Sequence, residues 1–162
     1  MGTLPCRRIS LIHVSLVWLY PMANVLFHLA FPVHDLEAAK GFYVAGLGCR
    51  LGRVSASALT LDLAGHQIIA HLDQTPGSAQ KGVYPRHFGL VFLSKTDWDV
   101  LALRAEKNNL TFYQQPRQRF PGTQLEHVTF FLEDPSRNLL EFKHYTFESA
   151  IFGDAQFTEV GD

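Results

Sequence analysis

The chain contains one pattern twice, and this repeat restricts the possible folds more than any other feature. HLAFPVHDLEAAKGFY begins at His28, and HFGLVFLSKTDWDVLALR begins at His87. Each segment starts with a histidine, continues as an apolar strand and enters an amphipathic helix. Self-similarity of this kind is the signature of a repeated structural unit. We therefore expect two copies of one module.

Three further strands follow the helix in each copy. In the first copy these are CRLGRVS, ALTLDLA and HQIIAHL, the last two joined by a tight turn at AGHQ. In the second copy they are LTFYQ and the hairpin HVTFFLEDPSRNLLEFKHY, which turns at DPSRN. The second copy is longer by QQPRQRFPGTQLE, which is predicted to be a loop. The predicted order is βαβββ twice, which is an α+β fold.

The repeat divides the chain into five segments. Residues 22–73 and 86–146 are the predicted modules, and the turn-rich residues 74–85 are a linker. Residues 1–21 form an apolar extension with three alternatives: an upstream segment without chemistry, an element that packs on the domain or a partner, or a signal peptide. Residues 147–162 form a C-terminal tail with a predicted short helix.

Composition argues against several classes of function. The chain has 162 residues and a net charge of −1, so no overall field attracts nucleic acid or anionic lipid. The apolar run from Ile9 to Tyr20 is too short to span a bilayer. Cys6 and Cys49 form no metal or redox motif and are too few for a disulfide framework. Their scarcity favours a reducing, cytoplasmic location.

Corresponding strands of the repeat carry candidate metal ligands. His28 and His87 open the first strand of each copy, and Glu141 lies in the apolar last strand NLLEFKHY. A carboxylate in such a strand is costly to bury unless it is paired or bound to metal. Two imidazoles and one carboxylate form a facial triad, which leaves positions on a divalent metal open for substrate and for oxygen or water. Each residue alone is more often structural, but the coincidence within a repeat favours a metal site.

The motifs that contain these residues resemble a known superfamily. FHLAFPVHDLEAAKGFY, GHQIIAHL, HFGLVF and FFLEDPSRNLLEFK are together similar to the vicinal oxygen chelate superfamily of glyoxalases, bleomycin-resistance proteins and extradiol dioxygenases. They look most like the small predicted dioxygenases of the extradiol dioxygenase family. The resemblance implies that the two βαβββ modules pair into an open, mostly antiparallel β-barrel that encloses a metal held by His28, His87 and Glu141. Arg137 stands where the turn of the family has glycine.

Other residues are secondary candidates. His71 lies one pleat beyond Ile69 on the same predicted face, and it is open between a fourth ligand, a catalytic acid/base or substrate contact, and a structural role. Arg119, Phe120 and Tyr113 are candidate substrate contacts, with a solvated loop or core packing as the alternative. Arg117 and Arg119 would meet an anionic substrate as bidentate donors. Three candidate proton donors, whose alternative is a surface or cross-strand role, are His127, Lys143 and Tyr145.

Three functions remain open. The first is a ring-cleaving, extradiol-type dioxygenase that uses Fe(II) and O₂ on a small catechol-like substrate. The second is a glyoxalase- or epimerase-like lyase or isomerase with Zn, Ni, Co or Mn as a Lewis acid. The third is a metal-free protein that sequesters a small molecule. A homodimer is expected because the superfamily often dimerises and the N-terminal extension is apolar; no nucleic-acid or membrane partner is expected.

Overall fold

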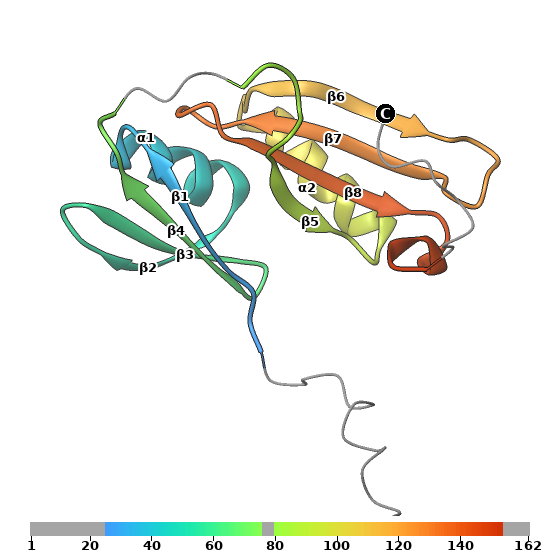
Figure 1. Ribbon diagram of the computed structural model, residues 1–162, viewed down its shortest axis with the longest axis horizontal. Coiled ribbons are helices and arrows are strands. Elements are labelled where there is room, and N and C mark those ends of the chain that lie inside the picture. Colours follow the sequence, from blue (N-terminus) through green and yellow to red (C-terminus); the bar gives the residue numbers. More distant parts are fainter. Residues whose placement is uncertain (1–24, 76–79, 154–162) are drawn as a thin grey trace, which may run out of the picture.

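The computed structural model describes residues 25–75 and 80–153 (Figure 1). These residues form two four-stranded sheets with the strand orders β1-β4-β3-β2 and β5-β8-β7-β6. In each sheet the first strand is parallel to the last strand, and the other pairings are antiparallel. The described elements thus follow the predicted βαβββ order twice. The predicted extension 1–21 and most of the predicted tail lie outside the described residues.

Elements of the first module begin and end at caps and turns that the sequence predicted. Its elements are β1 (His28–Val33), α1 (Leu36–Lys40) with a π-helical continuation over Gly41–Leu47, β2 (Arg50–Val54), β3 (Ala58–Leu63) and β4 (His66–Leu72). The Asp35 carboxylate accepts hydrogen bonds from two backbone amides of the first helical turn, at 2.8 and 3.0 Å. The helix ends at Gly48, whose φ is +89°. Ala64 and Gly65 both have positive φ, as a tight β3–β4 hairpin turn requires.

The second module differs from the prediction in one strand. Its elements are β5 (Phe88–Val91), α2 (Lys95–Lys107), β6 (Phe112–Arg119), β7 (His127–Glu133), β8 (Leu139–Tyr145) and a 3₁₀ turn (Glu148–Ile151). The strand predicted at LTFYQ extends to Arg119, so the first six residues of the predicted loop, QQPRQR, are strand. Two register irregularities and the edge position of β6 accommodate Pro116 there. Arg117 and Arg119 are therefore strand residues and not loop residues.

Each sheet turns one face toward the core and leaves the other open. Phe31 and Val33 of β1 and Leu140 and Phe142 of β8 are at most 6% exposed and face the core. Helix α2 packs against the core face of the second sheet, where the Trp98 indole donates to the Phe142 carbonyl at 2.9 Å (Figure 1). The two sheets in the described part of the chain form no closed barrel. No described helix is long and apolar enough to cross a membrane.

A buried polar network ties the DPSRN turn of the second module to the first. The Tyr43 hydroxyl, which is fully buried, donates to Asp134 Oδ2 at 2.9 Å. The Asp134 carboxylate also accepts from the backbone amides of Ser136 and Asn138 and from the Asn138 side chain. The same side-chain amide donates to the Pro32 carbonyl of β1 at 2.9 Å. Burial and then the Asp134 carboxylate raise the pKa of Tyr43 well above its usual value, so the hydroxyl remains a donor.

Arg137 occupies a left-handed backbone conformation in this turn, with φ of +66°. A side chain is strained there, and the Arg137 side chain is exposed, so its loss removes little packing. Arg137→Gly is expected to raise the free energy of unfolding by about 0.5–1 kcal/mol, after the extra chain entropy of glycine is subtracted. Urea denaturation measures this. The matched control is Arg53→Gly in β2, where φ is not positive and stability should fall; a fall for Arg137→Gly as well would contradict the prediction.

Candidate metal and substrate site

The open face of the second sheet brings His87 beside Glu141. Glu141 lies in β8 and pairs with Gly89 of β5, two residues after His87. A Cβ atom at Gly89 would lie 1.7 Å from the carbonyl oxygen of Glu141, so only glycine allows the two strands to approach this closely. The tight pairing places the His87 side chain against the Glu141 carboxylate.

The two side chains meet through atoms that both have lone pairs. His87 Nε2 lies 3.2 Å from Glu141 Oε2, and His87 Nδ1 lies 2.9 Å from the Val83 carbonyl oxygen. Because a carbonyl only accepts, Nδ1 carries a proton, and in neutral His87 the lone pair of Nε2 therefore faces the carboxylate. A proton or a metal cation between these atoms satisfies both. A histidine oriented by a backbone carbonyl is also the usual arrangement of a metal ligand.

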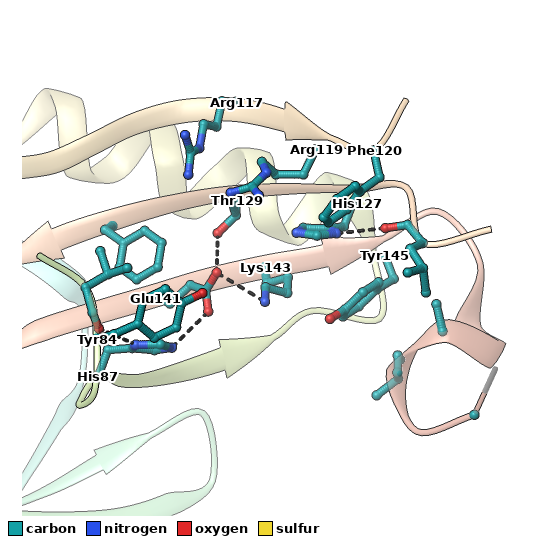
Figure 2. Close-up of a pocket in the computed structure, with 16 residues that line it drawn as sticks. Tyr84, His87, Arg117, Arg119, Phe120, His127, Thr129, Glu141, Lys143 and Tyr145 are labelled. Atoms are coloured by element: carbon teal, nitrogen blue, oxygen red, sulfur yellow. Dashed lines mark hydrogen bonds and ion pairs between the residues drawn. The ribbon is translucent and has the colours of Figure 1, made fainter. Parts of the chain in front are cut away.

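Two further donors fix the carboxylate (Figure 2). The Thr129 hydroxyl donates to Glu141 Oε1 at 2.8 Å, and Lys143 Nζ lies 3.2 Å from the same oxygen. Burial alone would raise the pKa of Glu141, but the His87 hydrogen bond and the Lys143 charge outweigh it and lower the pKa to about 2. The hydrogen bond to Glu141 in turn raises the pKa of His87. Glu141 is therefore an anion throughout the physiological range.

These atoms suit a divalent cation in type and spacing. Two ligands at about 2.1 Å from one ion and at right angles lie about 3.0 Å apart. The 3.2 Å between His87 Nε2 and Glu141 Oε2 fits two such adjacent ligands. Within the described residues, no three His, Cys, Asp or Glu side chains lie close enough together to hold a metal. The described residues of one chain thus supply two donors, His87 and Glu141, to this point.

His28 lies on the open face of the first sheet, away from His87 and Glu141. It pairs with Gln67 of β4, and its Nδ1 lies 2.8 Å from Gln67 Oε1. His71 shares this face, because it pairs with Pro32 of β1. It lies four residues beyond Gln67, which is roughly 13 Å along the strand. The structure does not bring His28 or His71 to the Glu141 carboxylate within one chain.

The register also identifies what stands in the first sheet at the position of Glu141. His28 pairs with Gln67, and His87 directly precedes the Phe88–Leu140 pair, which places it opposite Leu139. Two residues beyond Gln67 along β4 lies Ile69, and two residues beyond Leu139 along β8 lies Glu141. Ile69 therefore occupies in the first sheet the position that Glu141 occupies in the second. The first module therefore carries a histidine but no equivalent carboxylate.

A pocket of about 330 Å³ surrounds the His87–Glu141 pair. Arg119 and Phe120, which the sequence predicted as substrate contacts, line it, whereas Tyr113 of β6 does not. Thr129 and Phe131 also line the pocket and were not predicted from the sequence, although alternate residues of HVTFFLE share the face of Glu141 across the hairpin. The other lining residues are Val83, Tyr84, Arg117, Leu125, His127, Lys143, Tyr145, Ala150, Ile151 and Gly153.

His127 forms part of the pocket wall and is not a surface residue. It is 5% exposed and pairs across the strands with Tyr145, with ring centroids 4.9 Å apart. Its Nδ1 lies 2.8 Å from the Leu125 carbonyl oxygen, so this nitrogen carries the proton. Burial lowers the pKa of His127, so the imidazole is neutral at physiological pH.

The fold and the site define a class of small metal-binding or ligand-binding proteins, with a duplicated βαβββ unit and a histidine–carboxylate pair on an open sheet face. Comparison of the chain with known proteins identifies the family. The chain belongs to the glyoxalase/bleomycin resistance protein/dioxygenase superfamily, whose model matches residues 25–142. A glyoxalase/bleomycin resistance protein/dioxygenase from Alicyclobacillus acidocaldarius is 43% identical, with a TM-score of 0.75 over 80% of this chain and 97% of that chain.

Two more distant structures share the fold alone. The fosfomycin resistance protein FosX from Listeria monocytogenes is 20% identical, with a TM-score of 0.59 over 80% of this chain and 100% of that chain. A lactoylglutathione lyase from Agrobacterium tumefaciens is 19% identical, with a TM-score of 0.57 over 79% and 100%. No curated protein matches the chain.

Proposed function

We propose that this protein is a metal-dependent enzyme of the superfamily whose site is completed by a second copy of the chain. The observation that carries the proposal is the contact between His87 Nε2 and Glu141 Oε2, two electron-pair donors 3.2 Å apart in the lining of a pocket. His28 of the second subunit is the third ligand. Its ring lies on an exposed sheet face, so a partner can reach it.

A symmetric dimer accounts for the open faces of both sheets. The open face of the first sheet carries apolar Ala30, Pro32 and Ile69 beside His28. If this face covers the pocket of a partner, the same contact forms a second time around a twofold axis. Each pair of sheets would then form the open barrel that the sequence predicted, with residues from both chains. The dimer has two equivalent sites.

The favoured chemistry is ring cleavage of a small substrate with two adjacent oxygens. Because Ile69 offers no donor, three protein ligands leave coordination positions for substrate and O₂, the arrangement typical of non-haem Fe(II). When bound, the metal would supply Lewis-acid and redox chemistry. Lys143 and Thr129 hold the Glu141 carboxylate in position, and the Val83 carbonyl orients His87. We place the protein in the cytoplasm because its described cysteine, Cys49, is a buried free thiol.

The metal-free binding protein is the second candidate, and one observation favours it. Lys143 and a protonated His87 both pair with Glu141, so the charge of this carboxylate is compensated without any metal. The pocket then needs no ion to hold its carboxylate. The two candidates therefore differ in whether the purified protein contains metal.

Metal analysis of tag-free protein purified without oxygen tests the proposal. Wild type should contain about one equivalent of iron per chain, and His87→Ala should lose it because one of three ligands is gone. The matched control is His34→Ala, an exposed histidine outside the pocket, which should keep the metal. Thermal unfolding of all three checks that they are folded.

The identity of the metal separates the chemistries. Iron that is lost only in His87→Ala, together with oxygen uptake on catechols, supports the dioxygenase. Zinc, nickel, cobalt or manganese with the same dependence supports a glyoxalase- or epimerase-like enzyme. Wild type that stays metal-free after reconstitution with each ion excludes both and leaves the binding protein.

A further inference from the structure

The described lining of the pocket contains more positive charge than its single carboxylate can neutralise. Three cationic side chains line it: Arg117 and Arg119 from β6 and Lys143 from β8. Lys143 is paired with Glu141 at 3.2 Å. Neither arginine side chain makes an ion pair or hydrogen bond to any residue in the described part of the chain. Two guanidinium groups therefore line the pocket without a counter-charge from the described residues.

The sheet register places these groups in order along the pocket. Glu141 lies opposite Phe131, and the next pair in the same direction is Lys143 and Thr129, with Arg117 on the outer strand. The pair after that is Tyr145 and His127, with Arg119 outermost. Each step covers two residues, which is roughly 7 Å. The positive charge thus begins one step from the proposed metal position, with Lys143 and Arg117, and continues at the next step with Arg119 (Figure 2).

The aromatic residues make the same pocket suitable for a flat ring. Phe131 lies against His87, with ring centroids 5.3 Å apart, and Tyr84 lies 6.0 Å from the same imidazole. At the other end Phe120 lies 5.7 Å from His127. The volume of about 330 Å³ is at the lower end for small-molecule pockets, which suits a single-ring compound.

The guanidinium of Arg119 lies at the end of the pocket that contains Phe120 and His127. It lies 5.1 Å from the centre of the Phe120 ring, and Arg119 is half-buried. The neighbouring His127 is neutral, so the charge of this end comes from the arginines. A guanidinium binds a planar carboxylate through two parallel hydrogen bonds, which a neutral polar group does not match.

We propose that Arg117 and Arg119 bind the carboxylate of an aromatic acid whose two adjacent oxygens lie at His87 and Glu141. This substrate class rests on the function proposed above. Arg117 lies one step of the sheet from Glu141, a distance comparable to the length of a six-membered ring that carries a carboxylate opposite its oxygens, and Arg119 follows one step further on the same strand. The pocket therefore selects aromatic acids over neutral catechols by charge at one end and over aliphatic acids by its aromatic walls.

Isothermal titration calorimetry with benzoate and its neutral counterpart benzamide tests the arginine subsite on the full-length protein. Benzoate should bind more tightly than benzamide. Arg117→Gln and Arg119→Gln should each weaken benzoate by about ten- to a hundredfold and leave benzamide unchanged. The matched control is Arg50→Gln, which removes an arginine of β2 that is paired with Asp62 outside the pocket.

Metal content measured on the same samples separates this inference from the proposed function. Equal benzoate affinity in wild type, Arg117→Gln and Arg119→Gln would overturn the subsite, whatever the metal content. Tighter binding of phenyl phosphate than of benzoate would overturn the carboxylate assignment. Arginine-dependent benzoate binding in a protein that takes up no metal would support the subsite and refute the enzyme.

Discussion

Dimers re-formed from equal amounts of His28→Ala and His87→Ala chains are expected to bind metal at about one quarter of their sites, since random pairing makes half of the dimers mixed. Each variant alone should bind almost none. In a mixed dimer one site combines both lesions, whereas the other combines the intact His28 of one chain with the intact His87 and Glu141 of the other. Recovery by mixing is therefore a specific result of a site shared between chains.

A second mixture provides the control. His87→Ala and Glu141→Gln affect the same half of the site, so no mixed dimer contains an intact set, and metal should not recover. The measurement is metal per chain after the mixed dimers are isolated by gel filtration. Full metal in His28→Ala alone would show that His28 is not a ligand. Equal recovery in both mixtures would exclude a site shared in this way.

The parts of the fold that depend on local pattern could be predicted from the sequence. The Asp35 cap, the AGHQ turn and the DPSRN turn each have a local physical cause, and all three lie where predicted. Strand parity also placed Glu141 and His71 on the faces where the register has them. The local sequence pattern is sufficient to predict these features because each concerns only residues that are close together in the chain.

The extent of β6 could not be predicted in the same way. QQPRQR has polar composition, a proline and no alternation, which is typical of a loop. It is strand because β7 supplies hydrogen-bond partners and because an edge strand tolerates both the proline and the bulges. Arg117 and Arg119 are consequently aligned with Thr129 and His127 and line the pocket.

Neither the sequence pattern nor the structure of a single chain brings the three predicted ligands together. The repeat identifies His28 and His87 as equivalent, but equivalence within a duplicated chain does not decide whether the two copies face each other in one molecule or in two. In the described chain the copies do not face each other, because the core and the Asp134 network hold them by their other surfaces. The open faces then remain available to a partner.

Asp134→Ala is expected to lower the free energy of unfolding by roughly 3–4 kcal/mol, because it leaves several buried donors without an acceptor. Asp134 is 3% exposed and accepts four hydrogen bonds, from Tyr43, from the backbone of Ser136 and from the backbone and side chain of Asn138. Tyr43→Phe removes only one of these donors and should lower stability by about 1 kcal/mol. Urea denaturation with linear extrapolation gives both values.

The matched control separates this network from an ordinary carboxylate. Asp99→Ala removes a half-exposed aspartate that bridges Lys95 on the surface of α2, and it should change stability by less than about 0.5 kcal/mol. An effect of Asp134→Ala no larger than that of Asp99→Ala would show that the network does not hold the modules together. A large effect has a second consequence. Because the same network fixes which faces of the two sheets stay open, destabilised Asp134→Ala should also lose the dimer and, with it, the metal shared between chains.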